Sequence, residues 1–525
     1  MKFVVLRKNE YKQTGSKNVA YLDVDYWNDY SFVTMFYLTV FDNYGVEHKI
    51  GNVKIGFKGQ TTSKHTHETL GSSFLKLGDQ YFSLGTDVDY YKNLYKLGRD
   101  LKDYILNSLE DIVYSPVKIK SIEDEAVLNT SLFRWLTLSD VHGQFKRVLE
   151  GLEELSDFDF NFVRTGADGL CDIKIPFKVK VGSTPSTNIH AFIGRNGCGK
   201  TTILNGMIDA ITNPSDENCF FTEANNFTDS RIPAGYFRSL VSVSFSAFDP
   251  FTPPQEQPDP AKGTKYFYIG LKSRKNIESL SSLVELRQEF VSALIGCLSD
   301  DNKKKIWFDA INNLSSDKNF EDMGLSILNT RYINLKDKIK NEQFDSYLLE
   351  ELFYKDIYDY LNRMSSGHAI VLFTITRLVN TVGEKSLVLL DEPEGHLHPP
   401  LLSAFLRTLS DLLYVKNGVA IIATHSPVVL QEIPKSCVWK VIRSREVVNV
   451  ERPQIETFGE NLGVLTREVF SLEVTISGYH SLLSKSIESG LSYDQIISEY
   501  SDQIGLEGRT VLKAMILNRD ASKDA

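Results

Sequence analysis

Hydrophobic and polar positions follow two different patterns along the chain. Up to about residue 60, β-branched and aromatic residues dominate, and the run 30–41 is followed by turn residues at 42–45, which is typical of a hairpin or meander. From residue 86 to 109 the apolar residues recur at helical spacing, and helical patterning continues to about residue 155. The first part of the chain therefore predicts a mixed α+β region.

Short, largely apolar runs mark the second part of the chain. Residues 188–193, 387–390 and 419–423 form such runs, and runs of this length suit parallel strands that are covered on both faces. A further strand is predicted over 240–248, and residues 401–413 have the spacing of a helix. Together these runs predict an α/β fold with a mixed sheet.

Helical patterns interrupt this rhythm and then end the chain. Residues 276–363 are helical and charged, which predicts a lobe inserted between strands. Residues 460–525 are helical again, with an apolar stripe at Leu482, Leu483 and Ile487. We expect this end to be a small appended helical module.

Composition narrows the class of protein. The chain has 525 residues, 42% hydrophobic and 24% charged, which is ordinary globular material and enough for two or three cores. It shows neither a signal-peptide core nor a run of about 18 apolar residues, so we expect a cytoplasmic protein without membrane contact. The net charge of -10 argues against blanket nucleic-acid binding but leaves room for a local basic groove.

The most specific pattern is GxxxxGK[ST] at residues 194–201, between the strand 188–193 and a following helical run. Its glycines let the loop curl, so that backbone N–H groups and the next helix N-terminus surround the β-phosphate of ATP. Lys200 would bridge the β- and γ-phosphates, and Thr201 would bind Mg²⁺. The predicted nucleotide-binding residues are Gly194, Arg195, Asn196, Gly197, Cys198, Gly199, Lys200, Thr201 and Thr202.

An acidic pair follows the apolar run 387–390. A strand that carries an acid to the metal beside a phosphate loop is the Walker B arrangement, so Asp391 is the predicted Mg²⁺ ligand, directly or through water. Glu392 points differently and can polarise the attacking water as a general base. His425, at the end of the strand 419–423, is predicted to reach the γ-phosphate. Glu392 and His425 are therefore the predicted catalytic residues.

Residues 364–368, Met-Ser-Ser-Gly-His, resemble the signature motif of ABC ATPases, which is usually written LSGGQ. The resemblance implies that Ser365 corresponds to the signature serine, which contacts the γ-phosphate bound by a partner subunit. Ser366 follows it, and Gly367 would allow close approach of the backbone. Ser366 and His368 depart from the usual letters. Read alone, Ser-Ser-Gly before a helix is also an ordinary N-cap.

These motifs together imply a second copy of the chain. A phosphate loop and a signature on opposite lobes of one subunit cannot reach the same nucleotide, so two subunits must sandwich it. ATP then holds the interface together, and hydrolysis releases it, which couples the chemistry to opening and closing. The sequence thus predicts a head-to-tail dimer of ATPase subunits, able to assemble further, with ATP and Mg²⁺ as cofactors.

Residues 391–399 and 424–427 resemble the matching segments of SMC-like and OLD-like prokaryotic ATPases, and the likeness extends over about 190–470. Within this superfamily the chain is most similar to the PtuA-like ATPases of Septu and retron antiphage defence systems. That resemblance implies a PtuB-like HNH nuclease as a partner, which the ATPase regulates. A retron would add a reverse transcriptase with its RNA–DNA. The sequence shows no nuclease motif of its own.

On this resemblance the fold is an ABC-type P-loop NTPase head with an inserted helical signature lobe. The expected divisions are an N-terminal α+β extension over 1–157, an ATPase lobe with the phosphate loop over 158–275, a helical lobe ending in the signature over 276–385, an ATPase lobe with the acidic pair and His425 over 386–458, and a helical partner-docking module over 459–525.

Two other functions fit the same motifs. A RecF-like DNA-repair ATPase would clamp DNA directly, with direct contact through basic clusters such as 303–305, although solvated helix faces explain these clusters better. The nucleotide-binding subunit of a transporter is disfavoured by the large N-terminal extension and by the residues that follow the acidic pair. Residues 246–249 hold no glutamine, so no Q-loop is assigned.

Overall fold

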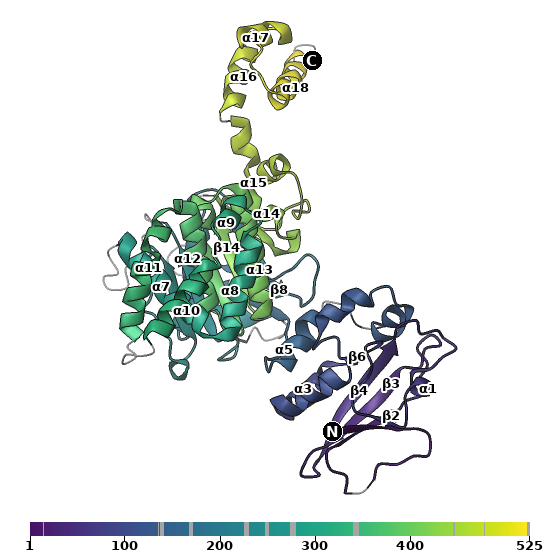
Figure 1. Cartoon of the computed structure of the whole chain (residues 1–525). Coiled ribbons are helices and arrows are strands. Elements are labelled where there is room, and N and C mark those ends of the chain that lie inside the picture. Colours follow the sequence, from purple (N-terminus) through teal and green to yellow (C-terminus); the bar gives the residue numbers. More distant parts are fainter. Residues whose placement is uncertain are drawn as a thin grey trace. The chain divides into compact units, whose positions relative to one another are not determined.

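The computed structural model of the chain contains two compact units, Met1–Ser156 and Asp157–Ala525, and both are drawn in Figure 1. The structure describes residues 1–13, 15–134, 136, 141–166, 172–224, 230–246, 251–272, 280–339, 346–444, 447–476 and 478–521.

The first unit is built on a mixed sheet. Among its described residues six strands run in the order β5–β1–β2–β3–β4–β6, and β3 and β4 pair across the predicted turn, which confirms the hairpin. The helical run predicted over 86–109 is broken, because Gly98 has a φ of 83° and begins a new helix. The strands are β1 (Lys2–Leu6), β2 (Val19–Val24), β3 (Met35–Phe41), β4 (Glu47–Phe57), β5 (Ser73–Phe74) and β6 (Tyr81–Gly85), and the α-helices are α1 (Thr66–Thr69), α2 (Val88–Lys96), α3 (Arg99–Ser108) and α5 (Lys146–Leu149).

The second unit is organised by a larger sheet of mainly parallel strands. In the described part of this unit the strand order is β12–β11–β13–β14–β9–β15–β16, and each neighbouring pair is parallel except β15–β16. Strands β9, β13 and β14 are buried along their whole lengths, as their apolar runs predict. The strands are β9 (Ile189–Ile193), β11 (Ser239–Ser244), β12 (Lys265–Gly270), β13 (Ser386–Asp391), β14 (Val419–Thr424), β15 (Val438–Ser444) and β16 (Val447–Glu451).

A second, antiparallel sheet completes the α/β core. Its order is β10–β7–β8, formed by β7 (Phe158–Arg164), β8 (Ile173–Val179) and β10 (Cys219–Glu223). The strand predicted over 240–248 ends at Ser244, and residues 247 and 248 lie outside the described part of the chain.

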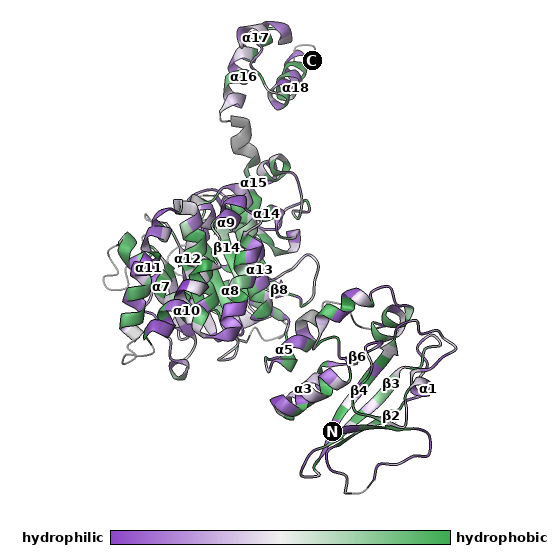
Figure 2. Ribbon diagram, viewed as in Figure 1, coloured by the Kyte–Doolittle hydropathy of each residue, from purple (hydrophilic) through white to green (hydrophobic). Residues whose placement is uncertain are grey.

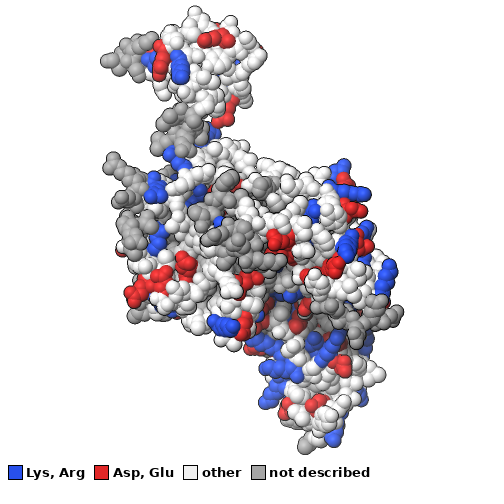
Figure 3. Space-filling model, turned by 90° about the vertical axis from the view of Figure 1, so that its left-hand side faces the viewer, with Lys and Arg blue, Asp and Glu red and all other residues white. Residues whose placement is uncertain are grey.

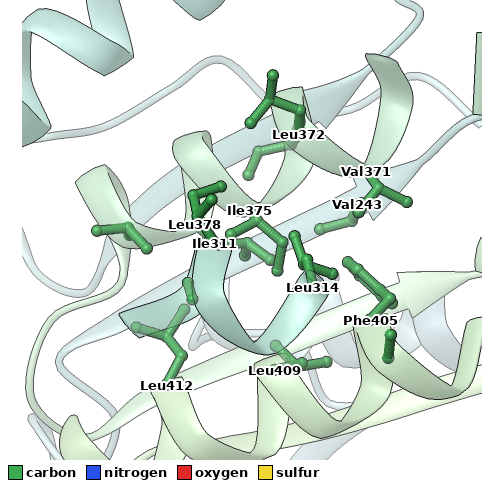
Figure 4. Close-up of a cluster of buried hydrophobic side chains, with 14 of the residues drawn as sticks. Val243, Ile311, Leu314, Val371, Leu372, Ile375, Leu378, Phe405, Leu409 and Leu412 are labelled. Carbon is green, nitrogen blue, oxygen red and sulfur yellow. The ribbon is translucent and has the colours of Figure 1, made fainter. Parts of the chain in front are cut away.

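Helices cover the large sheet and supply most of the buried apolar surface. Figure 4 shows Ile311 and Leu314 of α8 between Ile375 of α12 and Leu409 of α13. Each such fully buried side chain contributes about 1.5–3 kcal/mol relative to exposure. The hydropathy colouring of Figure 2 follows this packing, since α12 and β14 are largely green. The helices are α6 (Lys200–Thr212), α7 (Leu283–Ser299), α8 (Asp301–Leu314), α9 (Lys318–Asp322), α10 (Ile327–Ile339), α11 (Ser346–Asn362), α12 (Ser366–Thr381), α13 (Pro399–Val415) and α14 (Pro427–Gln431).

The C-terminal helices have a small apolar cluster of their own. Leu483, Ile487, Ile496 and Leu512 are buried there. The predicted stripe was wrong in one position, because Leu482 is 55% exposed and the buried face of its helix passes through Leu483 and Ile487. The helices are α15 (Leu462–Ile476), α16 (Tyr479–Glu488), α17 (Tyr493–Glu499) and α18 (Leu506–Ala521).

Among the helices described, none combines the length and the apolar character needed to cross a membrane.

A buried histidine on β9 makes the stability of the second unit depend on pH. His190 is fully buried, and its ring packs edge to face on Phe177. Burial, with a smaller contribution from the positive charge of Arg452, lowers the pKa of His190 to about 3. Because an unfolded histidine has a pKa of about 6.5, the unfolded chain binds a proton below that pH that the folded chain does not. Stability is therefore lost as the pH falls from about 6.5 toward 3.

We expect the His190→Leu variant to lose this dependence. The free energy of unfolding of the wild type should fall more steeply with decreasing pH than that of the variant, by about 1 kcal/mol per pH unit below pH 6. Urea unfolding at pH 7.5 and at pH 5, followed by fluorescence, measures the difference. Equal slopes in the two proteins would contradict the assignment of this pH dependence to His190.

Candidate functional site

The phosphate loop lies between β9 and α6, and its shape requires its glycines. A Cβ at Gly194 would lie 2.3 Å from the backbone oxygen of Val441 on β15, so no other residue fits there without displacing the strand. Gly197 and Gly199 have φ values of 78° and 102°, which side-chain-bearing residues rarely adopt. The loop therefore curls tightly over the end of β9 and leads directly into the N-terminus of α6.

Lys200 is held inside this curl. Its Nζ donates hydrogen bonds to the backbone oxygens of Gly194, at 2.9 Å, and of Arg195, at 3.0 Å. The loop residues Arg195 and Asn196 are exposed, whereas Cys198 is buried. Burial raises the pKa of the Cys198 thiol, so this thiol stays protonated and acts as a packing group. The positive charge of Lys200 thus sits at the centre of a loop whose helix N-terminus also favours anions.

A hydroxyl and a carboxylate meet beside the loop. Thr201 Oγ1, in the first turn of α6, donates to the carboxylate of Asp391 at the end of β13, with distances of 2.9 Å and 3.1 Å to its two oxygens. Asp391 is largely buried. Hydroxyl and carboxylate oxygens are the ligands that Mg²⁺ takes together with phosphate oxygens. These two residues therefore fit a magnesium ion shared with a bound nucleotide.

Two glutamates contact His425 next to this pair. Glu392 follows β13 with a φ of 46°, a left-handed backbone conformation that side-chain-bearing residues rarely adopt. His425 Nδ1 lies 3.6 Å from a carboxylate oxygen of Glu392 and 3.2 Å from one of Glu394. Glu394 Oε1 also accepts hydrogen bonds from Thr424 Oγ1 and from the backbone N–H of His425. Glu394 thus fixes the imidazole at the edge of the sheet.

The signature residues form the N-terminus of α12. Ser365 is its N-cap, and Ser365 Oγ accepts a hydrogen bond from the backbone N–H of His368. The same oxygen lies 2.5 Å from His368 Nδ1. Ser365 and Ser366 are exposed and Gly367 is partly exposed. A 16-residue helix thus presents its positive end, with two hydroxyl groups, at the surface.

The structure therefore brings the predicted residues together in two groups. The first group contains Lys200, Thr201 and Asp391. Glu392 belongs to it as well, because it follows Asp391 in the chain and contacts His425. Ser365 instead contacts His368, which also lies 3.3 Å from Asp317.

Sequence reasoning missed Glu394 and Asp317. The signal for Glu394 was its place in the run Asp391-Glu392-Pro393-Glu394, since a third acid at the end of a buried strand is costly unless it has partners. Asp317 carries no comparable signal, because it stands 51 positions before His368 and outside any motif.

A known protein is similar to this chain over its whole length. It is 64% identical over 523 residues to protein ea59 of Escherichia phage lambda, and the match covers 100% of this chain and 99% of the relative. The chain belongs to the ea59 family. A family model described as "AAA domain, putative AbiEii toxin, Type IV TA system" also matches residues 320–431 of this family member, which include the signature, the acidic pair and His425.

Solved structures similar to the chain include ABC transporter components. A nucleotide-free ATP-binding cassette is 16% identical, with 62% of this chain and 100% of that chain covered and a TM-score of 0.28. CbiO1 from Clostridium perfringens, part of the transporter complex cbiONQ, is 15% identical, with 61% and 96% covered and a TM-score of 0.30. Because these scores are low, the fold assignment rests on the strand order and the phosphate loop. The fold is that of an ABC-type P-loop ATPase head, an α/β fold with mixed sheets.

Proposed function

We propose that this chain binds and hydrolyses MgATP. The observation that carries the proposal is the contact between Thr201 and Asp391, 2.9 Å apart although 190 positions separate them, beside the loop that holds Lys200. In the proposed reaction Lys200 and the loop N–H groups hold the phosphates, and Thr201 and Asp391 hold Mg²⁺. Bound Mg²⁺ would neutralise charge on the phosphates.

The proposed catalytic residues are Glu392 and His425. Glu392 accepts a proton from the water that attacks the γ-phosphate, while His425, oriented by Glu394, contacts the γ-phosphate oxygens. Glu392 has the freedom this needs, since its side chain is about one third exposed. The transfer breaks the bond between the γ-phosphorus and the bridging oxygen, and ADP leaves with that oxygen.

We also propose that the site is completed by a second copy of the chain. Its support is the exposed N-terminus of α12, where Ser365, Ser366 and Gly367 offer hydroxyl and N–H groups to an anion. In a head-to-tail pair these groups would bind the γ-phosphate held by the other copy. ATP would then stabilise the dimer, and its hydrolysis would open it.

A pair of variants separates nucleotide binding from hydrolysis. Lys200→Ala removes the charge that holds the phosphates, so ATP should bind at least about tenfold more weakly. Glu392→Gln keeps the loop intact and removes the base, so ATP should bind normally while turnover falls at least about a hundredfold. Equilibrium binding of a fluorescent ATP analogue and release of phosphate measure the two effects.

Light scattering after size exclusion follows the dimer in the same variants. Glu392→Gln should accumulate dimer with MgATP, and Lys200→Ala should stay monomeric. Lys180→Ala, a change of an exposed lysine in the same unit, should behave as the wild type in all three measurements. Unchanged turnover in Glu392→Gln would refute its role as the base.

The finer proposal concerns what this ATPase controls. We propose that it regulates a partner HNH nuclease of PtuB type in antiphage defence, with a retron as one setting. The support is the sequence resemblance to PtuA-like ATPases, together with an N-terminal unit and C-terminal helices that have apolar cores separate from that of the ATPase sheets.

Direct DNA clamping has weaker support. Lys303, in the basic cluster 303–305, donates to two oxygens of Asn380 at 2.9 Å and so has a structural role. On the face drawn in Figure 3, Lys and Arg side chains lie among Asp and Glu side chains. Mixed charge of this kind gives a weaker attraction to phosphate backbones than a basic stripe does.

Co-purification distinguishes these partners. A tagged chain expressed with its neighbouring genes is isolated with and without nuclease treatment, and the bound proteins are identified by mass spectrometry. The proposal predicts an HNH protein in stoichiometric amount, and a reverse transcriptase with its DNA would indicate a retron. Recovery of the chain with DNA alone would contradict the nuclease proposal and favour the clamp.

A further inference from the structure

Three side chains from separate elements converge in the second unit, away from the phosphate loop. Asp317 caps the N-terminus of α9, His368 lies in the first turn of α12, and His398 caps α13. The Nε2 atoms of His368 and His398 lie 3.3 Å and 3.5 Å from the two carboxylate oxygens of Asp317. One ligand atom from each residue lies within 4.8 Å of the others.

The spacing of these atoms fits a metal ion as well as long hydrogen bonds. His368 Nε2 and Asp317 Oδ1 are within hydrogen-bonding distance, and the contact of His398 Nε2 ends on the other oxygen, Oδ2. Both are longer than the usual range of about 2.7–3.2 Å. Ligands about 2.0–2.2 Å from a tetrahedral zinc ion lie roughly 3.3–3.6 Å apart. We propose that Asp317, His368 and His398 bind a divalent transition-metal ion of the zinc class, with the fourth position left to water.

The surroundings support such a site. The side chains of Asp317 and His368 are 8% and 9% exposed, whereas that of His398 is 48% exposed and opens the cluster to solvent. The backbone N–H groups of Asn319 and Phe320 donate to Asp317 Oδ1 and fix the carboxylate. A zinc-binding histidine usually donates a hydrogen bond through its other ring nitrogen, and Nδ1 of His368 already faces a hydroxyl. In His398 a metal on Nε2 would put the ring proton on Nδ1, so metal binding would replace the 3.4 Å N-cap contact from the backbone N–H of Leu401.

A bound ion would affect the signature residue Ser365 through its hydrogen bond with His368. With a metal on Nε2, the ring proton of His368 sits on Nδ1 and is donated to Ser365 Oγ, 2.5 Å away. The serine hydroxyl hydrogen is then free to bind a γ-phosphate. Without the metal, Nδ1 can accept that hydrogen and withhold it. This link rests on the proposed role of Ser365 in ATP binding, whereas the metal site does not.

The test uses the full chain, stripped of metal with a chelator and titrated with cobalt(II) in the absence of nucleotide. Tetrahedral cobalt absorbs visible light, so binding is read without any activity. The wild type should bind one ion per chain at this site. His398→Asn removes a ligand nitrogen and keeps an N-cap acceptor for α13, and it should weaken binding at least tenfold. Asp317→Asn should do the same.

A matched control uses another histidine beside a carboxylate. His48 Nε2 lies 3.1 Å from Asp42, and among the described residues no third histidine, cysteine or acidic side chain joins this pair, so His48→Gln should bind cobalt as the wild type does. Circular dichroism confirms folding of each variant. Equal cobalt affinity in the wild type and both ligand variants would overturn the site, as would absence of binding in the wild type.

Zinc titration during ATP turnover then tests the link to Ser365. Zinc should change wild-type turnover several-fold and leave that of His398→Asn unaffected. Cobalt binding with unchanged wild-type turnover would overturn the link alone. A chain that hydrolyses no ATP would refute the proposed function while the cobalt result still decides the metal site.

Discussion

The parallel pairing of β14 between β9 and β13 is the constraint on which the candidate site depends. Ala423 pairs with Asp391 on one side and with Phe192 on the other, and Thr424 pairs with Ile193. This register places the carboxyl ends of three strands at one edge, so that the phosphate loop, the acidic pair and His425 meet although they are far apart in sequence. Because all three strands are fully buried, apolar burial fixes the polar geometry. A shift of one residue in β14 would turn its apolar side chains to the opposite face and separate these groups.

The three strands at this edge were predicted correctly from the sequence, because continuous apolar runs identify buried parallel strands. The residues that follow these runs match known motifs, so their meeting at one edge could also be expected. The contacts of Glu394 with Thr424 and His425 needed the register of two strands, which no local pattern contains. Asp317 reaches His368 only through packing of the helices. The helical face around Leu482 was misassigned because neighbouring leucines leave the phase of a short amphipathic helix ambiguous.

The two groups of polar residues suggest how hydrolysis could be controlled. The first group consists of Lys200, Thr201, Asp391 and the proposed base Glu392 at the sheet edge. The second joins the signature serine to Asp317 and His398, the latter just before α13. Helix α12 also contacts the short 3₁₀ helix at Pro393–His396, which follows Glu392. A change at the proposed metal site would therefore act on Ser365 and, through α12, on the segment that follows Glu392.

Each ATP site is proposed to be shared between two copies of the chain, and mixing two defective chains tests this sharing. Lys200→Ala removes the phosphate loop function, and Ser365→Arg blocks the signature, so each chain alone should be inactive. Because neither variant is expected to pair with itself, the dimers that form with MgATP pair the two variants, and each of these holds one intact site. We expect the equal mixture to recover phosphate release, up to about half that of the wild type. Activity of Ser365→Arg alone, or no recovery in mixtures shown to contain mixed dimers, would contradict it.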